Sequence, residues 1–485
     1  MTIDEYEPDN LILEINRKLA NVTLQSSFDD ESEYLSRSNL PTIKHALYSE
    51  NPDSCLRGVR MLRKYLTQSS EHNQAHADDI LSLEVLPRLR ELLLLHQHSG
   101  VQFETAWIIT NIGAGSTEQT TALLNADLIP ALVECLTSKT NNLRAAWALS
   151  NFAGESAPFR ELLANNHALV AVSSALNDAF DDIYEEARQH SYSDSEMSVV
   201  APVLRTIINL TSGPDELSSR VLESSLVLRN ISRLMQPGVS VAIRRDAFLV
   251  VSNFAASNLS VVERVMNRPD LIHSVLSHLH APEPAYNERS PWTIPTESRK
   301  GHRTQEEWGI TKECLWILCN LTTLATDENL CLLLSDYPTL PSLLGGLLHY
   351  IYVPHNACIK AIDLIINLIA RTNQLTEVFP PLNPRPANPI VREFIDLGVR
   401  EILPTLCEVS EKWSVLYERC AVLSSMLGEA ETEDGDGDIA SQFGLQASKY
   451  KTTGANKRRV LRGLEDGDVR LIENALNTIS ISERE

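Results

Sequence analysis

Residues 103–112 of this chain read FETAWIITNI, and residues 143–152 repeat the same helical pattern as LRAAWALSNF. Related versions, each with an asparagine in the same frame, occupy residues 202–210, 247–254, 315–321 and 362–368. The asparagines of the six copies follow one another at intervals of 40, 58, 44, 67 and 47 residues. A recurring interval of about 40–47 residues is typical of α-helical repeat proteins.

The whole region from Leu40 to about Leu427 follows this helical pattern. Apolar residues recur at steps of three and four, and clusters of Gly, Pro, Asn and Ser interrupt them. A single repeat cannot bury its own apolar face, so the repeats are expected to stack. We therefore predict an all-α protein, a right-handed α-solenoid of about eight repeats of the armadillo or HEAT type. The two long intervals are expected to contain loops, around residues 178–197 and 281–309.

The sequence divides into four predicted segments. Residues 1–39 contain nine acidic and three basic residues and are expected to be mostly flexible. Residues 40–428 form the predicted solenoid, and residues 429–448 form an acidic linker. Residues 449–485 begin with a basic stretch and continue into a predicted short helix.

Composition limits the classes of function. The formal net charge of −22 argues against nucleic-acid binding, because contacts to phosphate need a basic surface. The same charge favours basic protein partners, and it equally fits simple solubility. The eight cysteines include no CxxC pair, which is typical of reduced core residues. With no apolar run of 18 residues and no signal sequence, we expect a soluble protein of the cytoplasm and nucleus without membrane contact.

Tryptophan and asparagine recur four residues apart, which places both on one face of a helix. The pairs are Trp107 and Asn111, Trp147 and Asn151, and Trp316 and Asn320. An asparagine side chain can pair with the backbone of an extended peptide, and indole faces can hold the stem of a lysine. Packed helices lie roughly 8–10 Å apart and extended chain advances about 3.3 Å per residue, so each repeat would contact about two to three peptide residues.

A core role is the simpler interpretation of any one of these residues. A single tryptophan in an amphipathic helix is more often a core residue, and a single asparagine is usually a cap or a turn partner. Six asparagines in one frame position favour a binding surface instead. Helix packing has no evident need for an amide there, and burying one without partners costs about 1–3 kcal/mol.

Residues 103–120 and 147–160 resemble the second and third armadillo repeats of the importin-α family. The resemblance implies a receptor that binds extended Lys/Arg-rich nuclear localisation signals along a concave face lined by tryptophan and asparagine. It implies a major site in which the glycine, threonine and acidic positions hold the key lysine of the signal. The implied major-site residues are Trp107, Asn111, Gly115, Thr120, Trp147, Asn151 and Glu155. Glu155 stands where the family usually has aspartate.

Residues 204–215 resemble the sixth repeat of the family, and residues 312–322 resemble its minor-site repeats. The implied minor-site residues are Arg205, Asn209, Asp215, Asn253, Glu313, Trp316 and Asn320. If residue 205 corresponds to the sixth repeat, about two repeats are missing after Asn151 and the two sites lie closer together. Tryptophan is absent at Arg205, Leu249 and Asp363, so the minor site is expected to hold lysine stems less tightly.

Adaptors of the importin-α family begin with a basic segment that recruits importin-β, whereas residues 1–39 are acidic. The sequence therefore argues against importin-β as a partner without excluding it. The basic stretch at residues 449–462 could replace that segment, fold back as a pseudo-substrate, or remain a solvated tail.

A second function class remains open: an armadillo scaffold or dedicated chaperone for a basic partner that does not engage importin-β. An enzyme is not predicted, because the sequence has no Gly-rich phosphate loop, no HExxH and no GxSxG. We expect no cofactor and no metal site.

Overall fold

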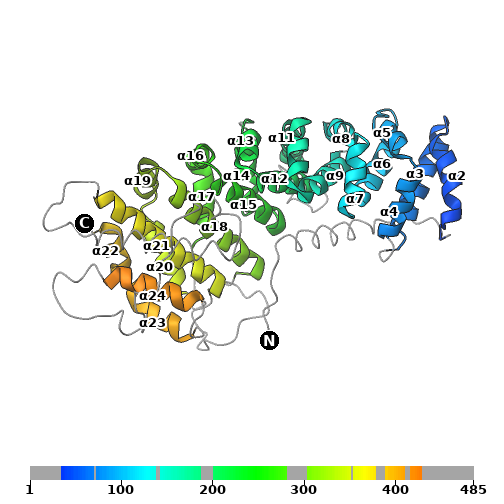
Figure 1. Cartoon of the computed structure of the whole chain (residues 1–485). Helices are drawn as coiled ribbons and strands as arrows, with labels where there is room; N and C mark the ends of the chain where they lie inside the picture. The colour runs from blue at the N-terminus through cyan, green and yellow to red at the C-terminus, as the bar shows by residue number, and fades with distance from the viewer. Residues whose placement is uncertain are drawn as a thin grey trace. The chain divides into compact units, whose positions relative to one another are not determined.

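The computed structural model describes residues 34–69, 73–137, 142–186, 200–224, 226–280, 303–350, 353–377, 388–409 and 415–428. Within these ranges the regular structure consists of twenty-three α-helices and one 3-10 helix, η2 (Arg37–Asn39), which confirms the predicted all-α fold. Helices run in sequence order from blue to orange in Figure 1. The predicted N-terminal segment before residue 34, the linker and the basic C-terminal stretch lie outside the described residues, as do residues 187–197 and 281–302 of the predicted loops. The loop predictions were wrong for residues 178–186 and 305–309, which are helical and belong to α11 (Ala168–Glu186) and α18 (Gln305–Leu324).

The chain forms two compact units, residues 1–250 and residues 251–485, with the boundary inside α15 (Val241–Ala255). The other helices of the first unit are α2 (Leu40–Leu47), α3 (Pro52–Thr67), α4 (Asn73–Ser82), α5 (Leu86–Leu93), α6 (Ser99–Ile112), α7 (Thr117–Asn125), α8 (Leu128–Thr137), α9 (Asn142–Glu155), α10 (Ala157–Asn165), α11 (Ala168–Glu186), α12 (Val200–Thr211), α13 (Asp215–Val221) and α14 (Leu226–Leu234). After the initial pair α2 and α3, these helices follow one another in groups of three.

The second unit continues with three groups of three helices. They are α16 (Leu259–Met266), α17 (Pro269–Ser277) and α18 (Gln305–Leu324), then α19 (Asp327–Asp336), α20 (Leu340–His349) and α21 (His355–Glu377), then α22 (Pro389–Asp396), α23 (Val399–Val409) and α24 (Val415–Gly428). The six asparagines of the sequence pattern all lie on the third helix of a group. The long interval between Asn253 and Asn320 falls between α15 and α18, where residues 281–302 precede the third helix.

Short polar side chains begin several of the helices. The side chain of Asn51 accepts hydrogen bonds from the backbone N–H groups of Asp53 and Ser54 at the start of α3. A capping box formed by Ser116 and Gln119 begins α7. Such caps satisfy backbone donors that have no partner inside the helix and typically contribute about 1 kcal/mol.

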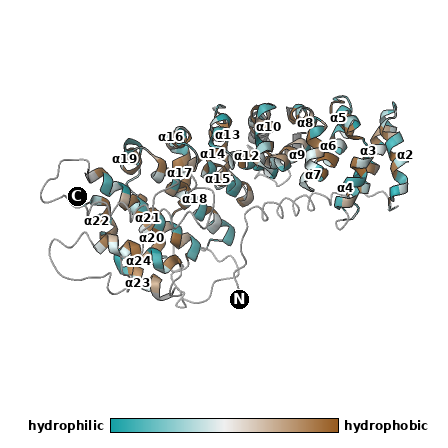
Figure 2. Ribbon diagram, in the orientation of Figure 1, coloured by the Kyte–Doolittle hydropathy of each residue, from teal (hydrophilic) through white to brown (hydrophobic). Residues whose placement is uncertain are grey.

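Apolar side chains pack between neighbouring helices in each unit. The third helices α3, α6, α9 and α12 pack side by side in the first unit, and α18, α21 and α24 do so in the second. Phe152 on α9 and Phe394 on α22 are fully buried. Figure 2 shows hydrophobic and hydrophilic residues alternating along individual helices, as expected for helices with one packed face. Gly58 permits close packing of α3 on α2, because a Cβ there would lie 2.9 Å from the Cβ of Ala46.

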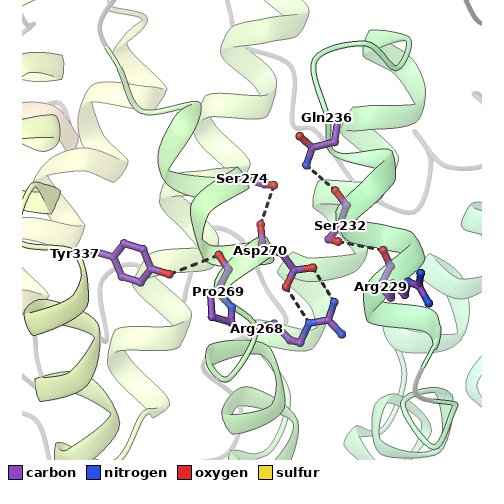
Figure 3. Close-up of polar contacts among 8 residues, drawn as sticks. All are labelled: Arg229, Ser232, Gln236, Arg268, Pro269, Asp270, Ser274 and Tyr337. Carbon is purple, nitrogen blue, oxygen red and sulfur yellow. Dashed lines mark hydrogen bonds and ion pairs between the residues drawn. The ribbon is translucent and has the colours of Figure 1, made fainter.

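Polar contacts join α17 to α19 in the second unit (Figure 3). The guanidinium of Arg268 donates to both carboxylate oxygens of Asp270, at 2.9 and 2.7 Å, across the start of α17. These hydrogen bonds raise the pKa of Arg268. The hydroxyl of Tyr337, just after α19, donates to the carbonyl oxygen of Pro269 at 3.5 Å. The two helices are thus joined at the N-terminus of α17.

The cysteines are all free. Six of the eight are buried, as the sequence predicts for reduced core residues, whereas Cys331 is exposed and Cys407 is half-buried. In the described part of the chain, no single helix has the length and hydrophobicity to cross a bilayer. The pair α19 and α20, bent by 72°, reaches the threshold only when the two helices are taken together.

Candidate functional site

A row of asparagine side chains crosses the third helices of the first unit. The amide nitrogen of Asn151 on α9 donates to the carbonyl oxygen of Thr110 on α6, at 3.0 Å. The amide nitrogen of Asn209 on α12 donates in the same way to Ser150 on α9, at 2.9 Å. Thr110 and Ser150 directly precede Asn111 and Asn151, so the bond repeats in register from one helix to the next.

The second unit contains the same bond. Asn367 on α21 donates to the carbonyl oxygen of Cys319 on α18 at 3.2 Å, and Cys319 directly precedes Asn320. Asn367 also donates to the hydroxyl groups of Thr322 and Thr323. The sequence argument that helix packing does not need asparagine at this position was therefore wrong, because the amide joins neighbouring repeats.

Two asparagines of the row retain an available acceptor. Asn111 and Asn151 are half-buried, and their Oδ1 atoms accept no hydrogen bond from any described residue. The amide of Asn111 donates to the carbonyl oxygen of Trp107, at 2.8 Å. Asn209 and Asn320 are almost fully buried, and Asn253 is half-buried in the second unit. Asn111 and Asn151 are thus the two members of the row in the first unit that a peptide could reach.

Trp107 does not present an open indole face. It is 7% exposed, and two guanidinium groups stack on its ring. The Cζ atom of Arg63, on α3, lies 4.3 Å from the ring centroid, and that of Arg144, on α9, lies 3.9 Å from it. The side chains of the protein itself therefore occupy the place that the sequence assigns to the stem of a peptide lysine.

Trp147, Asn151 and Glu155 follow one another at one-turn intervals on α9, and all three are half-buried. The carboxylate of Glu155 accepts a hydrogen bond from the hydroxyl of Thr117 at 2.6 Å. In the described residues no cation stacks on Trp147 or pairs with Glu155. This arrangement has the indole surface, the amide acceptor and the negative charge that a lysine side chain on an extended peptide needs.

The other two predicted major-site residues have local structural roles. Gly115 lies against the side chain of Gln119, and a Cβ at this position would clash with it. Thr120 is fully buried, and its hydroxyl donates to the carbonyl oxygen of Ser116 at 3.0 Å. The structure thus places Thr120 away from solvent, out of reach of a peptide side chain.

Arg205 and Asn209, two predicted minor-site residues, lie on α12, which packs on the helix α9 that carries Trp147 and Asn151. Arg205 is 7% exposed, and its guanidinium donates to both carboxylate oxygens of Asp246 on α15, at 3.1 and 3.2 Å. Asp215 is exposed at the start of α13. A buried arginine paired in this way holds two helices together and is not available to a ligand.

In the second unit, Trp316 also carries a cation of the chain. The ammonium of Lys360 on α21 lies 4.1 Å from the ring centroid, and it pairs with Asp363 at 3.4 Å. Asp363 also accepts a hydrogen bond from Arg419 on α24 at 2.8 Å. Glu313 is half-buried on the same helix as Trp316. The amide nitrogen of Asn320 is buried, with no hydrogen-bond partner among the described residues.

The armadillo/β-catenin-like repeat family matches residues 73–114, which span α4, α5 and α6. Importin subunit alpha-2 of Arabidopsis thaliana is 31% identical over 142 residues, which are 29% of this chain and 26% of that protein. Importin subunit alpha-1b of Oryza sativa subsp. japonica is 25% identical over 232 residues, covering 42% of this chain and 43% of that protein. The chain is an armadillo-repeat protein distantly related to importin-α.

The aligned part of the chain spans less than half the length of either relative. The crystal structure of an engineered protein has a similar fold, with a TM-score of 0.53 and 15% identity over 92% of this chain and 99% of that one. Together with the armadillo/β-catenin-like match over residues 73–114, this similarity bears out the predicted fold of stacked α-helical repeats. Groups of three stacked helical segments are the units of this fold in both compact parts of the chain.

The sequence interpretation missed the cations of this armadillo protein that stack on its tryptophans. Arg144 and Lys360 each lie seven residues before a repeat asparagine, Asn151 and Asn367, and thus share its helix face. This seven-residue spacing is a sequence signal that could have identified both cations as residues of the same helix face as the asparagine. The partner ring lies on the preceding third helix in both cases, which the sequence alone does not show. No cluster of potential metal ligands occurs among the described residues.

Proposed function

We propose that this armadillo protein is an importin-α-like receptor for extended peptides that carry Lys/Arg-rich nuclear localisation signals. The observation that carries the proposal is the arrangement on α9, where Trp147, Asn151 and Glu155 lie half-buried at one-turn intervals. The distant relation to importin-α supports the same conclusion.

Each of the three residues has a distinct role in this proposal. The Oδ1 atom of Asn151 accepts a hydrogen bond from a peptide N–H, while its amide nitrogen remains bonded to Thr110. The indole of Trp147 packs against the methylene stem of a lysine. The carboxylate of Glu155, oriented by the hydroxyl of Thr117, pairs with the ammonium group. A hydrogen bond to a charged group contributes about 1.5–3 kcal/mol, so one lysine dominates the affinity.

The decisive test is binding of a fluorescein-labelled lysine-rich signal peptide, measured by anisotropy. Glu155→Gln removes the charge at nearly constant volume, and we expect the affinity to fall about tenfold or more. The matched control is Glu118→Gln, because Glu118 is an exposed acid at the start of the adjacent helix α7 and should leave binding unchanged. Circular dichroism checks that helicity is retained. Parental affinity in Glu155→Gln would overturn the proposal.

A specific observation also favours the second function, a scaffold or chaperone for a basic partner. The chain's own cations stack on two of the three repeat tryptophans, Trp107 and Trp316, so fewer lysine positions are available than in the major and minor sites of the resemblance. A pull-down with purified importin-β separates the two functions. Retention of importin-β supports a transport adaptor found in cytoplasm and nucleus, whereas its loss together with retained peptide binding supports the scaffold.

A further inference from the structure

Two guanidinium groups contact the carboxylate of Glu104 beside Trp107, and a third stacks on the indole ring. The Nε atom of Arg63 donates to Glu104 at 2.5 Å, and the Nε atom of Arg60 lies 3.4 Å from the other oxygen of the same carboxylate. Arg144 approaches from the opposite neighbour, α9, over the ring of Trp107. Three positive charges and one negative charge thus lie around Trp107, in a protein whose overall charge is −22.

Arg144 is the unusual member of the cluster. It is 6% exposed, yet its guanidinium has no hydrogen bond or ion pair with any described residue. The Nε atom is both enclosed and unpaired. The two terminal nitrogens are unpaired but not enclosed, so solvent or a ligand can reach them. The cation rests only on aromatic rings, at 3.9 Å from Trp107 and 5.2 Å from Phe103.

Burial of this unpaired cation is costly. Desolvation, together with the nearby charge of Arg63, lowers the pKa of Arg144 to about 10, while the charge of Glu104 opposes the shift. A buried charge is normally compensated by a partner that also satisfies its donors. Two parallel N–H groups of a guanidinium match the two oxygens of a carboxylate or phosphate, so an oxyanion is the group that would complete this site.

The distance between the arginine cluster and the lysine site determines how many residues separate the two charged side chains of the peptide. Trp107 lies on α6, and Trp147, against which the lysine stem packs, occupies the equivalent position on α9, and these two helices pack directly on each other. Neighbouring helices are roughly 8–10 Å apart and extended chain advances about 3.3 Å per residue, which corresponds to about two to three residues. A peptide that crosses both helices therefore presents two residues of this separation to the two sites.

We propose that the bound peptide places an acidic side chain, carboxylate or phosphate, against Arg144 and Arg63, two or three residues from the lysine held by Glu155. This inference rests on the proposed function and narrows it. The preferred ligand is a peptide of mixed charge, because the first tryptophan position selects an anion and the next one selects a cation. A purely basic peptide meets repulsion at Arg144.

The test uses the full chain and short fluorescein-labelled peptides, each with one lysine in an uncharged extended background. Glutamate is placed two or three residues before or after the lysine, and each peptide is paired with its glutamine version. We expect at least one placement in which glutamate increases affinity about tenfold over glutamine. A parallel peptide with phosphoserine at that placement shows whether phosphate or carboxylate is the preferred source of the oxyanion.

Arg144→Gln should abolish the preference for glutamate and leave the affinity for the glutamine peptide unchanged or higher. If Arg144→Gln does not fold, Arg63→Gln provides the same test, because Arg63 is partly exposed at the cluster. Arg90→Gln is the matched control, since Arg90 is a partly exposed arginine on α5 paired with Asp127.

Two failures are distinguishable. If lysine is required but glutamate gives no advantage at any placement, or if the advantage survives in Arg144→Gln, the anion site is refuted and the proposed receptor function stands. If no peptide depends on its lysine or on Glu155, the proposed function is refuted as well.

Discussion

Trp107 in the first unit and Trp316 in the second occupy the same position of their repeats, and a cation of the chain stacks on each of them. The surroundings differ. Lys360, above Trp316, pairs with Asp363, which also binds Arg419. Arg144, above Trp107, has no such partner among the described residues.

The difference shows that a cation stacked on a tryptophan can serve stability or binding. It serves stability where an acidic side chain of the protein pairs with it, and it can serve binding where no such acid is present. In the second unit the stacked cation pairs with an acid that also binds a second cation, in a network across α18, α21 and α24. In the first unit the guanidinium N–H groups of Arg144 remain unpaired, and this buried, unpaired charge lowers the stability of the fold. Sites that bind ligands commonly retain such a local loss of stability.

The largest expected effect is in the ion-pair network of Lys360, Asp363 and Arg419. Asp363→Asn leaves Lys360 and Arg419 buried without their shared acid, and breaking a buried ion pair in this way costs about 3–5 kcal/mol. Thermal unfolding followed by circular dichroism should show a clearly lower midpoint. Glu418→Gln, an exposed acid on α24, is the control and should leave the midpoint unchanged. A midpoint for Asp363→Asn equal to that of the parent would mean that the network is not a stabilising element.

A smaller loss is expected for Lys360→Met. This substitution keeps most of the apolar stem but removes the cation over Trp316, while Asp363 retains Arg419. Loss of the stack and of one charged contact should cost about 1–2 kcal/mol. Denaturant titration of the variant measures it. Unchanged stability would show that the two stacked cations are equivalent, contrary to the comparison.

The smallest expected effect on stability is that of Arg144→Met. The variant loses the stack on Trp107 and Phe103 but also removes an unpaired buried charge, so the two contributions offset and the change should stay below about 1 kcal/mol. The same denaturant titration applies. A loss as large as that of Asp363→Asn would indicate that Arg144 is a structural residue, and the anion site would lose its main support.

Helical repeats, their period and the position of the asparagine frame could be predicted from the sequence, because apolar periodicity is a local property of each helix. The prediction that Trp107 and Asn111 share a helix face follows from the same periodicity. The tryptophan and asparagine pattern also predicted the surface chemistry of Trp147 and Asn151 on α9, whereas Glu155 followed only from the resemblance to importin-α. Their role as a binding site remains a prediction.

The stacking of two arginine side chains on Trp107 could not be predicted in the same way. Arg63 and Arg144 are far from Trp107 along the chain, on the two helices that pack against α6. Likewise, the bond from Asn151 to Thr110 depends on the register between α9 and α6. Periodicity determines which face of a helix a side chain occupies. The atoms opposite that face depend on how neighbouring repeats pack, and this packing gives one tryptophan a pair of arginines and leaves the next within reach of a ligand.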